Sequence, residues 1–380
     1  MRKQNVSRYK EYLLANGHEL VFSPEESERI IIWTCAFRED VRDNSLSELK
    51  RYQKEYDSEI IVAGCLPDID PDLLDSNFKG RLINWRDEEQ KIEEIWEPDN
   101  LKFNQISPVF IEERKCDDVE KFKIENPGKQ ATFYDQFLKL VISEGCSFDC
   151  TYCSERLMFP VFRSFPEEEL VKACSRMIDD TGEYRIALMA DSLGDYGQDI
   201  GSNLPTLLKK LKAIHPNIQF VLFNYHPAHF IKFFEEMENF IQNEYFYHIN
   251  LPIQSASNRI LKLMKRLYSK EDLERIFRMM RNNSFDFYDT HIIIGFPSET
   301  EKEFEETINF VIDNKIKYVL TSKCMLNQKM PAYQLSGQID SDTMNRRIKI
   351  AEERMKQAGI IVNSDSGEHM KKRFKRLNQI

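Results

Sequence analysis

A regular alternation of apolar runs and helical patterns occupies the chain from about residue 134 onward. Runs rich in β-branched and aromatic residues predict six strands, at 138–143, 184–190, 218–224, 247–253, 288–294 and 317–324. The segments between them predict helices at 166–180, 204–214, 229–241, 270–281 and 299–314. Strands that alternate with helices form parallel sheets, because each helix carries the chain back to the edge where the next strand begins. The alternation predicts a partial (β/α)6 barrel with its functional residues at the C-terminal ends of the strands.

A smaller unit of the same kind precedes the barrel. Apolar runs at 30–34 and 60–63 predict two buried strands, and a helical charge pattern from Asn44 to Tyr56 lies between them. The fold class is therefore α/β, with a small N-terminal parallel α/β domain followed by the partial barrel. We expect an N-terminal domain at 1–97, a linker at 98–133, the barrel at 134–340, and a C-terminal helix with a basic tail at 341–380.

Three cysteines directly follow the first strand of the predicted barrel. Three residues separate Cys146 from Cys150, and two separate Cys150 from Cys153. A loop this tight can turn three thiolates toward one [4Fe–4S] cluster, which leaves one iron without a protein ligand. That iron is available for chemistry. The alternatives are a zinc knuckle or three unconnected buried cysteines, although zinc sites more often combine two Cys-x-x-Cys pairs or mixed Cys/His sets.

Two further cysteines, Cys35 and Cys65, lie just after the first two strands of the N-terminal domain. The carboxyl ends of parallel strands share one edge of the sheet, so both cysteines are expected together at that edge. The pair is a candidate metal site, and two buried core cysteines are the alternative. Cys174 and Cys324 fit small core residues, whereas Cys116 lies in the charged linker.

Composition narrows the classes of function. The chain has 380 residues and a net charge of −10, which weighs against broad, non-specific nucleic-acid binding. The sequence contains no apolar run of the roughly 20 residues that a membrane helix needs, and the N-terminus has no apolar signal core. We therefore expect a cytoplasmic protein with no membrane partner.

Polar or glycine-containing turns follow the later barrel strands. They are Asp191 to Gly197, Asn224 to Pro227, Leu251 to Ser257, and Ile294 to Thr300. Turns at this end of a barrel are suited to hold a nucleoside and a methionyl group.

These stretches together resemble the radical S-adenosylmethionine (SAM) methylthiotransferases, a family that modifies tRNA adenosines or a ribosomal-protein aspartate. Tyr152 is the aromatic residue that the radical SAM superfamily prefers before its third cysteine. The resemblance extends to the four strand-end turns and to 33–35, 63–65, 260–266 and 330–333.

The resemblance implies that Cys146, Cys150 and Cys153 hold a [4Fe–4S] cluster that binds S-adenosyl-L-methionine and cleaves it reductively. It also implies a second [4Fe–4S] cluster, which uses Cys35 and Cys65 and supplies the sulfur that is transferred. Electrons would come from a reductant such as flavodoxin or ferredoxin. Cofactor-binding roles are expected for Tyr152, Arg163, Ser164, Asp191, Ser192, Gln254, Ser255 and Gly295.

The sequence departs from the family at three places. Only two of the three expected auxiliary cysteines are visible, and Cys116 is the nearest spare thiol. The family's C-terminal substrate-binding β-barrel has no counterpart in the residues after 358, and His291 stands where the family commonly has Asp. We therefore expect C–S bond formation on a peptide or small molecule. A tRNA methylthiotransferase, or a one-cluster radical SAM enzyme with other chemistry, is the alternative.

Overall fold

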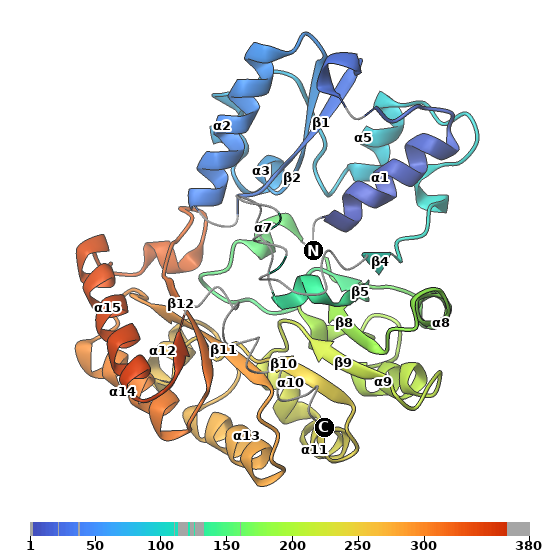
Figure 1. Ribbon diagram of the computed structural model, residues 1–380. Helices are drawn as coiled ribbons and strands as arrows, with labels where there is room; N and C mark the ends of the chain where they lie inside the picture. Colours follow the sequence, from blue (N-terminus) through green and yellow to red (C-terminus); the bar gives the residue numbers. More distant parts are fainter. Residues whose placement is uncertain are drawn as a thin grey trace. The chain divides into compact units, whose positions relative to one another are not determined.

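The computed structural model describes residues 3–21, 23–36, 39–109, 111–112, 121, 125, 133–159 and 161–362. The chain divides into two compact units. The first contains 1–110, 144–146 and 153–162, and the second contains 111–143, 147–152 and 163–380. Both are built from parallel strands and helices (Figure 1), which confirms the α/β fold class. The domain boundaries expected from the sequence remain a proposal.

The first unit contains a three-stranded parallel sheet in the order β1-β2-β3. The predicted strands correspond to β1 (Arg29–Thr34) and β2 (Glu59–Gly64), and the helix between them is α2 (Glu39–Glu55). The remaining elements include α1 (Lys3–Ala15), α3 (Leu66–Ile69), α4 (Pro71–Asp75), β3 (Arg81–Leu82) and α5 (Glu88–Ile95).

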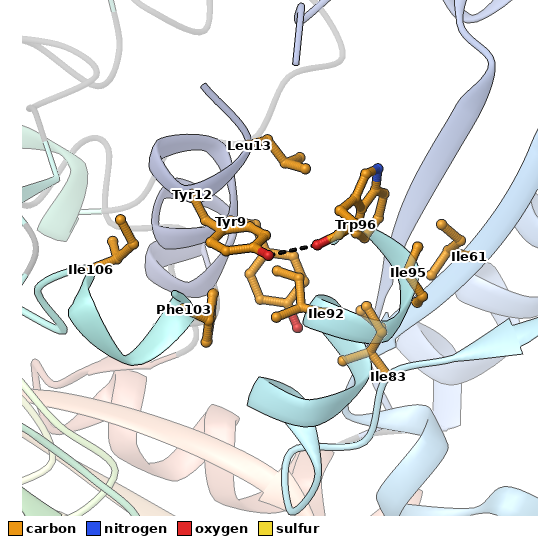
Figure 2. Packing of buried hydrophobic residues seen from close by; sticks show 11 residues of the cluster. Tyr9, Tyr12, Leu13, Ile61, Ile83, Ile92, Ile95, Trp96, Phe103 and Ile106 are labelled. Atoms are coloured by element: carbon orange, nitrogen blue, oxygen red, sulfur yellow. Dashed lines mark hydrogen bonds between the residues drawn. The ribbon is translucent and has the colours of Figure 1, made fainter. Parts of the chain in front are cut away.

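Both faces of β2 are buried in the first unit, because successive side chains of a strand point to opposite sides. Ile61 and Ala63 pack into one apolar cluster, and Ile60 and Val62 pack into another on the opposite face. Figure 2 shows the first of these clusters, where the hydroxyl of Tyr12 donates a hydrogen bond of 2.6 Å to the carbonyl of Trp96. This double burial explains why the strand is a continuous apolar run.

The second unit is built on an eight-stranded sheet in the order β13-β12-β11-β10-β9-β8-β5-β4. All the pairings in this sheet are parallel except that of β4 with β5. The strands are β4 (Ile111–Glu112), β5 (Leu138–Val141), β8 (Arg185–Met189), β9 (Gln219–Leu222), β10 (Phe246–Asn250), β11 (Tyr288–Ile294), β12 (Tyr318–Lys323) and β13 (Ile361–Val362). The six barrel strands predicted from the sequence are confirmed. The sequence did not predict β4 and β13, the strands at the two edges of the sheet, because a strand of two residues is too short to show an apolar pattern.

Helices cover the outer face of this sheet in Figure 1. They are α8 (Glu167–Thr181), α9 (Leu204–Lys212), α10 (Pro227–Lys232), α11 (Phe234–Gln242), α12 (Asn258–Leu263), α13 (Lys270–Asn282), α14 (Glu301–Asp313) and α15 (Ser341–Gln357). The single helix expected at 229–241 is two helices that meet at Phe233, whose backbone leaves the helical region. Cys116 and the basic tail lie outside the described residues. In the described part of the chain, no helix is both long and apolar enough to span a membrane.

Candidate active site

The loop with the three cysteines begins on a backbone conformation that favours glycine. Gly145 has φ +83°, and a Cβ on it would lie 2.8 Å from the carbonyl oxygen of Val161. Gly145, Cys146 and Val161 all belong to the first unit, as does Cys153, and both cysteines are half-buried. A side chain at position 145 would therefore displace the chain directly before the first cysteine.

The segment around Cys150 belongs to the second unit, where it is anchored by backbone contacts. The hydroxyl of Thr151 donates to the carbonyl of Leu263 at 2.9 Å, and the amide of Thr151 donates to Met264 at 3.2 Å. The carbonyl of Thr151 accepts from the amide of Ala332 at 3.0 Å. Cys150 itself is buried, so these contacts fix the position of a thiol that is shielded from water.

A buried carboxylate holds the residue directly after Cys146. Asp195 accepts hydrogen bonds from the amide of Ser147 at 2.9 Å and from its hydroxyl at 2.6 Å. The Nε2 of His229 lies 2.8 Å from the same carboxylate. Burial alone would raise the pKa of Asp195, but the contacts with His229 and Ser147 outweigh it and hold the pKa below its ordinary value. The carboxylate is therefore ionised and acts as the anchor of the loop.

Phe148 adds an aromatic contact to this anchor. Its ring stacks on the imidazole of His226, with ring centroids 3.8 Å apart. The Nδ1 of His226 accepts a hydrogen bond from the amide of Ala228 and caps the N-terminus of α10. Burial lowers the pKa of His226 well below its usual value, so this imidazole is neutral at pH 7.

Arg266 contacts the sulfur of the middle cysteine. Its guanidinium donates to Cys150 Sγ at 3.6 Å and to the hydroxyl of Tyr152 at 3.3 Å. It also donates to the hydroxyl of Tyr268 at 2.8 Å and to the carbonyl of Pro252 at 2.9 Å. Arg266 is only 9% exposed. A guanidinium does not lose its proton in a protein, so its charge must be balanced where it stands.

The charges around Cys150 suit a thiolate ligand of an iron–sulfur cluster. Within the described residues, no carboxylate lies within ion-pairing distance of Arg266, and its oxygen partners are neutral hydroxyls and a carbonyl. Thiolates are the ligands of such clusters, and a cluster held by Cys150 would place a negative charge beside Arg266. The described cysteines form no disulfide.

The residues with expected cofactor roles occupy two kinds of position in the second unit. Tyr152 packs against a small apolar cluster formed by Ile260, Met264, Phe296, Cys324 and Ala332. Arg163 is exposed, whereas the neighbouring Ser164 is buried and accepts a hydrogen bond from the amide of Gly197 at 2.8 Å. Ser164 therefore supports the turn that follows β8.

That turn carries Asp191 and Ser192. Asp191 is half-buried, and Ser192 is buried with a hydroxyl that has no hydrogen-bond partner among the described residues. A buried hydroxyl without a partner is costly, which favours a polar ligand at this strand end.

The other three cofactor candidates follow β10 and β11. Gln254 adopts φ +64°, an uncommon conformation for a residue with a side chain, and its backbone pairs with Ile292. Ser255 turns its hydroxyl toward Thr307, with the two oxygens 3.2 Å apart. Gly295 has φ +87° and donates its amide to Glu299 at 2.9 Å. The ligand roles of all these residues remain proposals.

A polar cluster joins β10 and β11. The amide nitrogen of Asn250 lies 2.6 Å from the carboxylate of Asp289 and 3.0 Å from Nε2 of His291. His248 Nε2 lies 3.4 Å from Asp289. Burial would raise the pKa of Asp289, but the two histidines and Asn250 lower it to about 2. Asp289 and His291 therefore share the side-chain amide of Asn250.

Cys35 and Cys65 stand where the sequence predicted them, after β1 and β2 of the first unit. Thr34 and Gly64 are partners in the parallel register of β1 and β2, so Cys35 and Cys65 come next on neighbouring strands. The amide of Cys65 donates to the carbonyl of Thr34 at 2.9 Å. Their common position at the sheet edge is observed, and their role as ligands is a proposal.

Sequence reasoning gave no role to Asp195, His229 or Arg266. Arg266 lies 116 residues from Cys150, and Asp195 lies 48 residues from Ser147. No local spacing joins such pairs. The one sequence signal was that Asp195 and Arg266 both fall inside stretches that resemble the family.

Comparisons with known proteins agree with this site. The model of the Radical SAM superfamily matches residues 140–311, and the one described as Uncharacterized protein family UPF0004 matches residues 1–83. Among solved structures, the radical SAM methyltransferase TsrM of Kitasatospora setae has a TM-score of 0.56 at 13% identity, covering 87% of this chain and 69% of that one. The cobalamin-dependent radical enzyme OxsB has a TM-score of 0.52 at 12% identity, covering 93% and 53%. These two structures show the fold alone. Fold and cysteine motif together define a radical SAM enzyme, which works with a [4Fe–4S] cluster and SAM.

The relatives specify the family. A probable threonylcarbamoyladenosine tRNA methylthiotransferase of Pyrococcus horikoshii is 30% identical over 301 residues, which is 79% of this chain and 68% of that protein. The ribosomal protein uS12 methylthiotransferase RimO of Thermotoga maritima is 28% identical over 350 residues, 88% of this chain and 76% of that protein. The chain belongs to the radical SAM methylthiotransferase family.

Proposed function

We propose that this enzyme forms a carbon–sulfur bond by transferring a methylthio group to an adenosine of tRNA. Membership in the family supports the reaction type. Relatives with the identity and coverage of the Pyrococcus protein support the tRNA substrate. This proposal replaces the peptide or small molecule expected from the departures from the family and from the acidic balance. A net charge of −10 limits non-specific binding but does not exclude a local RNA contact.

Cys146, Cys150 and Cys153 would hold a [4Fe–4S] cluster, which together with SAM would supply the radical chemistry that activates an unreactive C–H bond. The chain's own residues prepare the site for this. Asp195 and Phe148 hold the loop, and Arg266 shields and balances Cys150. The buried hydroxyl of Ser192 and the strained turn at Gln254 are proposed SAM contacts. Burial of these groups limits the access of water that would quench a radical.

The observation that carries the C–S chemistry is the placement of Cys35 and Cys65 after paired residues of β1 and β2. Two thiols at one sheet edge can serve as ligands of a second [4Fe–4S] cluster, which in this family supplies the transferred sulfur. In the same unit, Cys65 packs in the apolar cluster that also contains Met158 and Phe159, a few residues after Cys153.

Cluster reconstitution of a Cys146→Ala, Cys150→Ala, Cys153→Ala triple variant tests the second cluster. We expect remaining iron and sulfide and an EPR signal after reduction, and we expect both to disappear when Cys35→Ala and Cys65→Ala are added. A Cys174→Ala variant is the matched control, because Cys174 is fully buried in α8 and lies outside both sets. Absence of iron from the triple variant would contradict the C–S assignment and favour one-cluster chemistry.

Anaerobic turnover with SAM, a reductant and tRNA tests the substrate. Digestion of the tRNA and mass spectrometry should detect an adenosine that carries a methylthio group. A peptide from ribosomal protein uS12 is the second substrate to include, because relatives such as the Thermotoga enzyme are named for that protein. Modification of the peptide alone, with no tRNA binding even at low salt, would establish the second candidate instead.

A further inference from the structure

Arg266 combines a buried charge with a contact to a cysteine sulfur, and structural support alone does not explain both. It follows α12 at a tight turn, where its amide donates to Leu261 at 2.8 Å and Lys265 adopts φ +57°. A helix end of this kind can be closed by any residue. An apolar residue or a methionine would fill the space without the cost of burying a cation.

The surroundings of Arg266 offer it one partner that carries a negative charge when it binds a cluster. Within the described residues its nitrogens contact two phenol hydroxyls, one carbonyl and the sulfur of Cys150. Its carbon Cζ also lies 5.2 Å from the ring centroid of Tyr268. Phenols and carbonyls hydrogen-bond a guanidinium but do not neutralise it. A thiolate does, and a cation beside a thiolate alters the electrostatic energy of any cluster that the sulfur binds.

We propose that Arg266 provides the counter-charge for the cluster thiolate of Cys150 and thereby raises the reduction potential of the cluster held by this loop. The inference depends on the proposed role of Cys150 as a cluster ligand. Reduction takes one electron from an external one-electron donor and adds one negative charge beside Cys150, and no proton has to move. A fixed positive charge with a hydrogen bond to the sulfur favours that reduced state, because charge and sulfur hydrogen bonds both tune cluster potentials.

The structure also supplies a matched control for the charge. Arg266 lines a hollow of about 490 Å³ that opens to solvent, and Lys262 lines the same hollow from α12. Asp149 and Lys265 also face it and form an ion pair with each other. Lys262 has the same charge as Arg266 but, within the described part of the chain, forms no hydrogen bond to a cysteine, so its removal changes the charge of the hollow without changing the charge beside Cys150.

The test is an EPR-monitored redox titration of the reconstituted protein with variants Arg266→Met, Arg266→Lys and Lys262→Met. We expect Arg266→Met to make reduction at least tenfold less favourable, a shift of about 59 mV to more negative potential for one electron. Arg266→Lys keeps the charge without the planar fork and should recover part of that shift. Lys262→Met should match the wild type. An unchanged potential in Arg266→Met at full iron content would overturn the proposal.

The variants also decide the case in which Arg266→Met binds no cluster. Full cluster assembly in Arg266→Lys would then show that the charge is required, which supports the proposal. Failure of both variants, with circular dichroism like that of the wild type, would show that the shape of Arg266 matters rather than its charge, and would overturn it. A wild-type protein without a cluster would instead contradict the proposed function, so the two failures are distinguishable.

Discussion

Replacing Asp195 with Asn removes the charge that anchors the loop while keeping the shape of the side chain. Asp195 is 1% exposed and accepts two hydrogen bonds from Ser147, and His229 lies on the same carboxylate. Hydrogen bonds to charged groups contribute about 1.5–3 kcal/mol each. Because the amide keeps one acceptor, we expect a loss of about 3 kcal/mol from the free energy of unfolding.

Urea unfolding followed by far-UV circular dichroism measures this loss, provided that the slope against urea is unchanged. Ser147→Ala removes only the hydroxyl contact and should cost about 1.5 kcal/mol. In the double variant the Ser147 effect should shrink by about 1 kcal/mol, because the two residues share one interaction. Asp199→Asn is the control, since Asp199 is an exposed carboxylate that accepts one hydrogen bond, from the amide of Ser164.

If Asp195→Asn lowers the free energy of unfolding by no more than Asp199→Asn does, Asp195 does not anchor the loop. The same conclusion follows if the effects of Asp195→Asn and Ser147→Ala simply add, since additive effects would mean that the carboxylate does not act through Ser147. Iron content after reconstitution gives a second readout. A loop that has lost its anchor should retain less iron at equal protein concentration, whereas Asp199→Asn should retain the wild-type amount.

Three further substitutions test single contacts within the two units. Burial raises the pKa of Glu299 to about 7 despite its contact with Arg347, so the folded state holds a proton that the unfolded state releases near pH 4.5. The free energy of unfolding should therefore fall as the pH rises from about 4.5 to 7, and Glu299→Gln should flatten this slope in urea unfolding. Gly64→Ala places a Cβ 2.2 Å from the carbonyl oxygen of Thr34 at φ +94°, so it should lower the stability measured in thermal unfolding by well over 2 kcal/mol. Gly17→Ala, at φ +81° with open space around it, should lower the stability by about 1 kcal/mol, and equal losses would contradict the steric argument. Tyr12→Phe leaves the carbonyl of Trp96 without its hydroxyl donor and should cost about 1 kcal/mol in the same assay, and no loss would mean that the bond of Figure 2 contributes nothing net.

Local patterns determined what could be predicted from the sequence. The apolar runs and the spacing of Cys146, Cys150 and Cys153 lie within a few residues of each other, so strand order and the cysteine motif could be predicted. The contacts that support the loop join residues far apart in the chain, such as Cys150 and Arg266. No periodicity encodes these contacts, and each depends on how the strands are ordered in the sheet.

The limits of local reasoning also appear in single residues. Phe233 lies inside an unbroken helical pattern, yet the helix ends there and a new one begins. Ser255 was selected as a SAM contact because it follows a barrel strand, but its hydroxyl is engaged with Thr307 of α14. The sequence indicates which strand end carries a polar group, whereas only the packing decides which way that group turns.

The division of the cysteine stretch between the two units limits how the first unit can be exchanged between proteins. Residues 144–146 and 153–162 belong to the first unit, although more than thirty residues of the second unit separate them from residue 110 in the sequence. Met158 and Phe159 complete an apolar cluster with Cys65, and Phe159 contacts Trp85 edge to face at 4.9 Å. A gene fragment that ends near residue 110 therefore encodes an incomplete core. Residues 1–110 therefore do not form a separate module, and an exchange of the first unit between proteins must include the cysteine stretch.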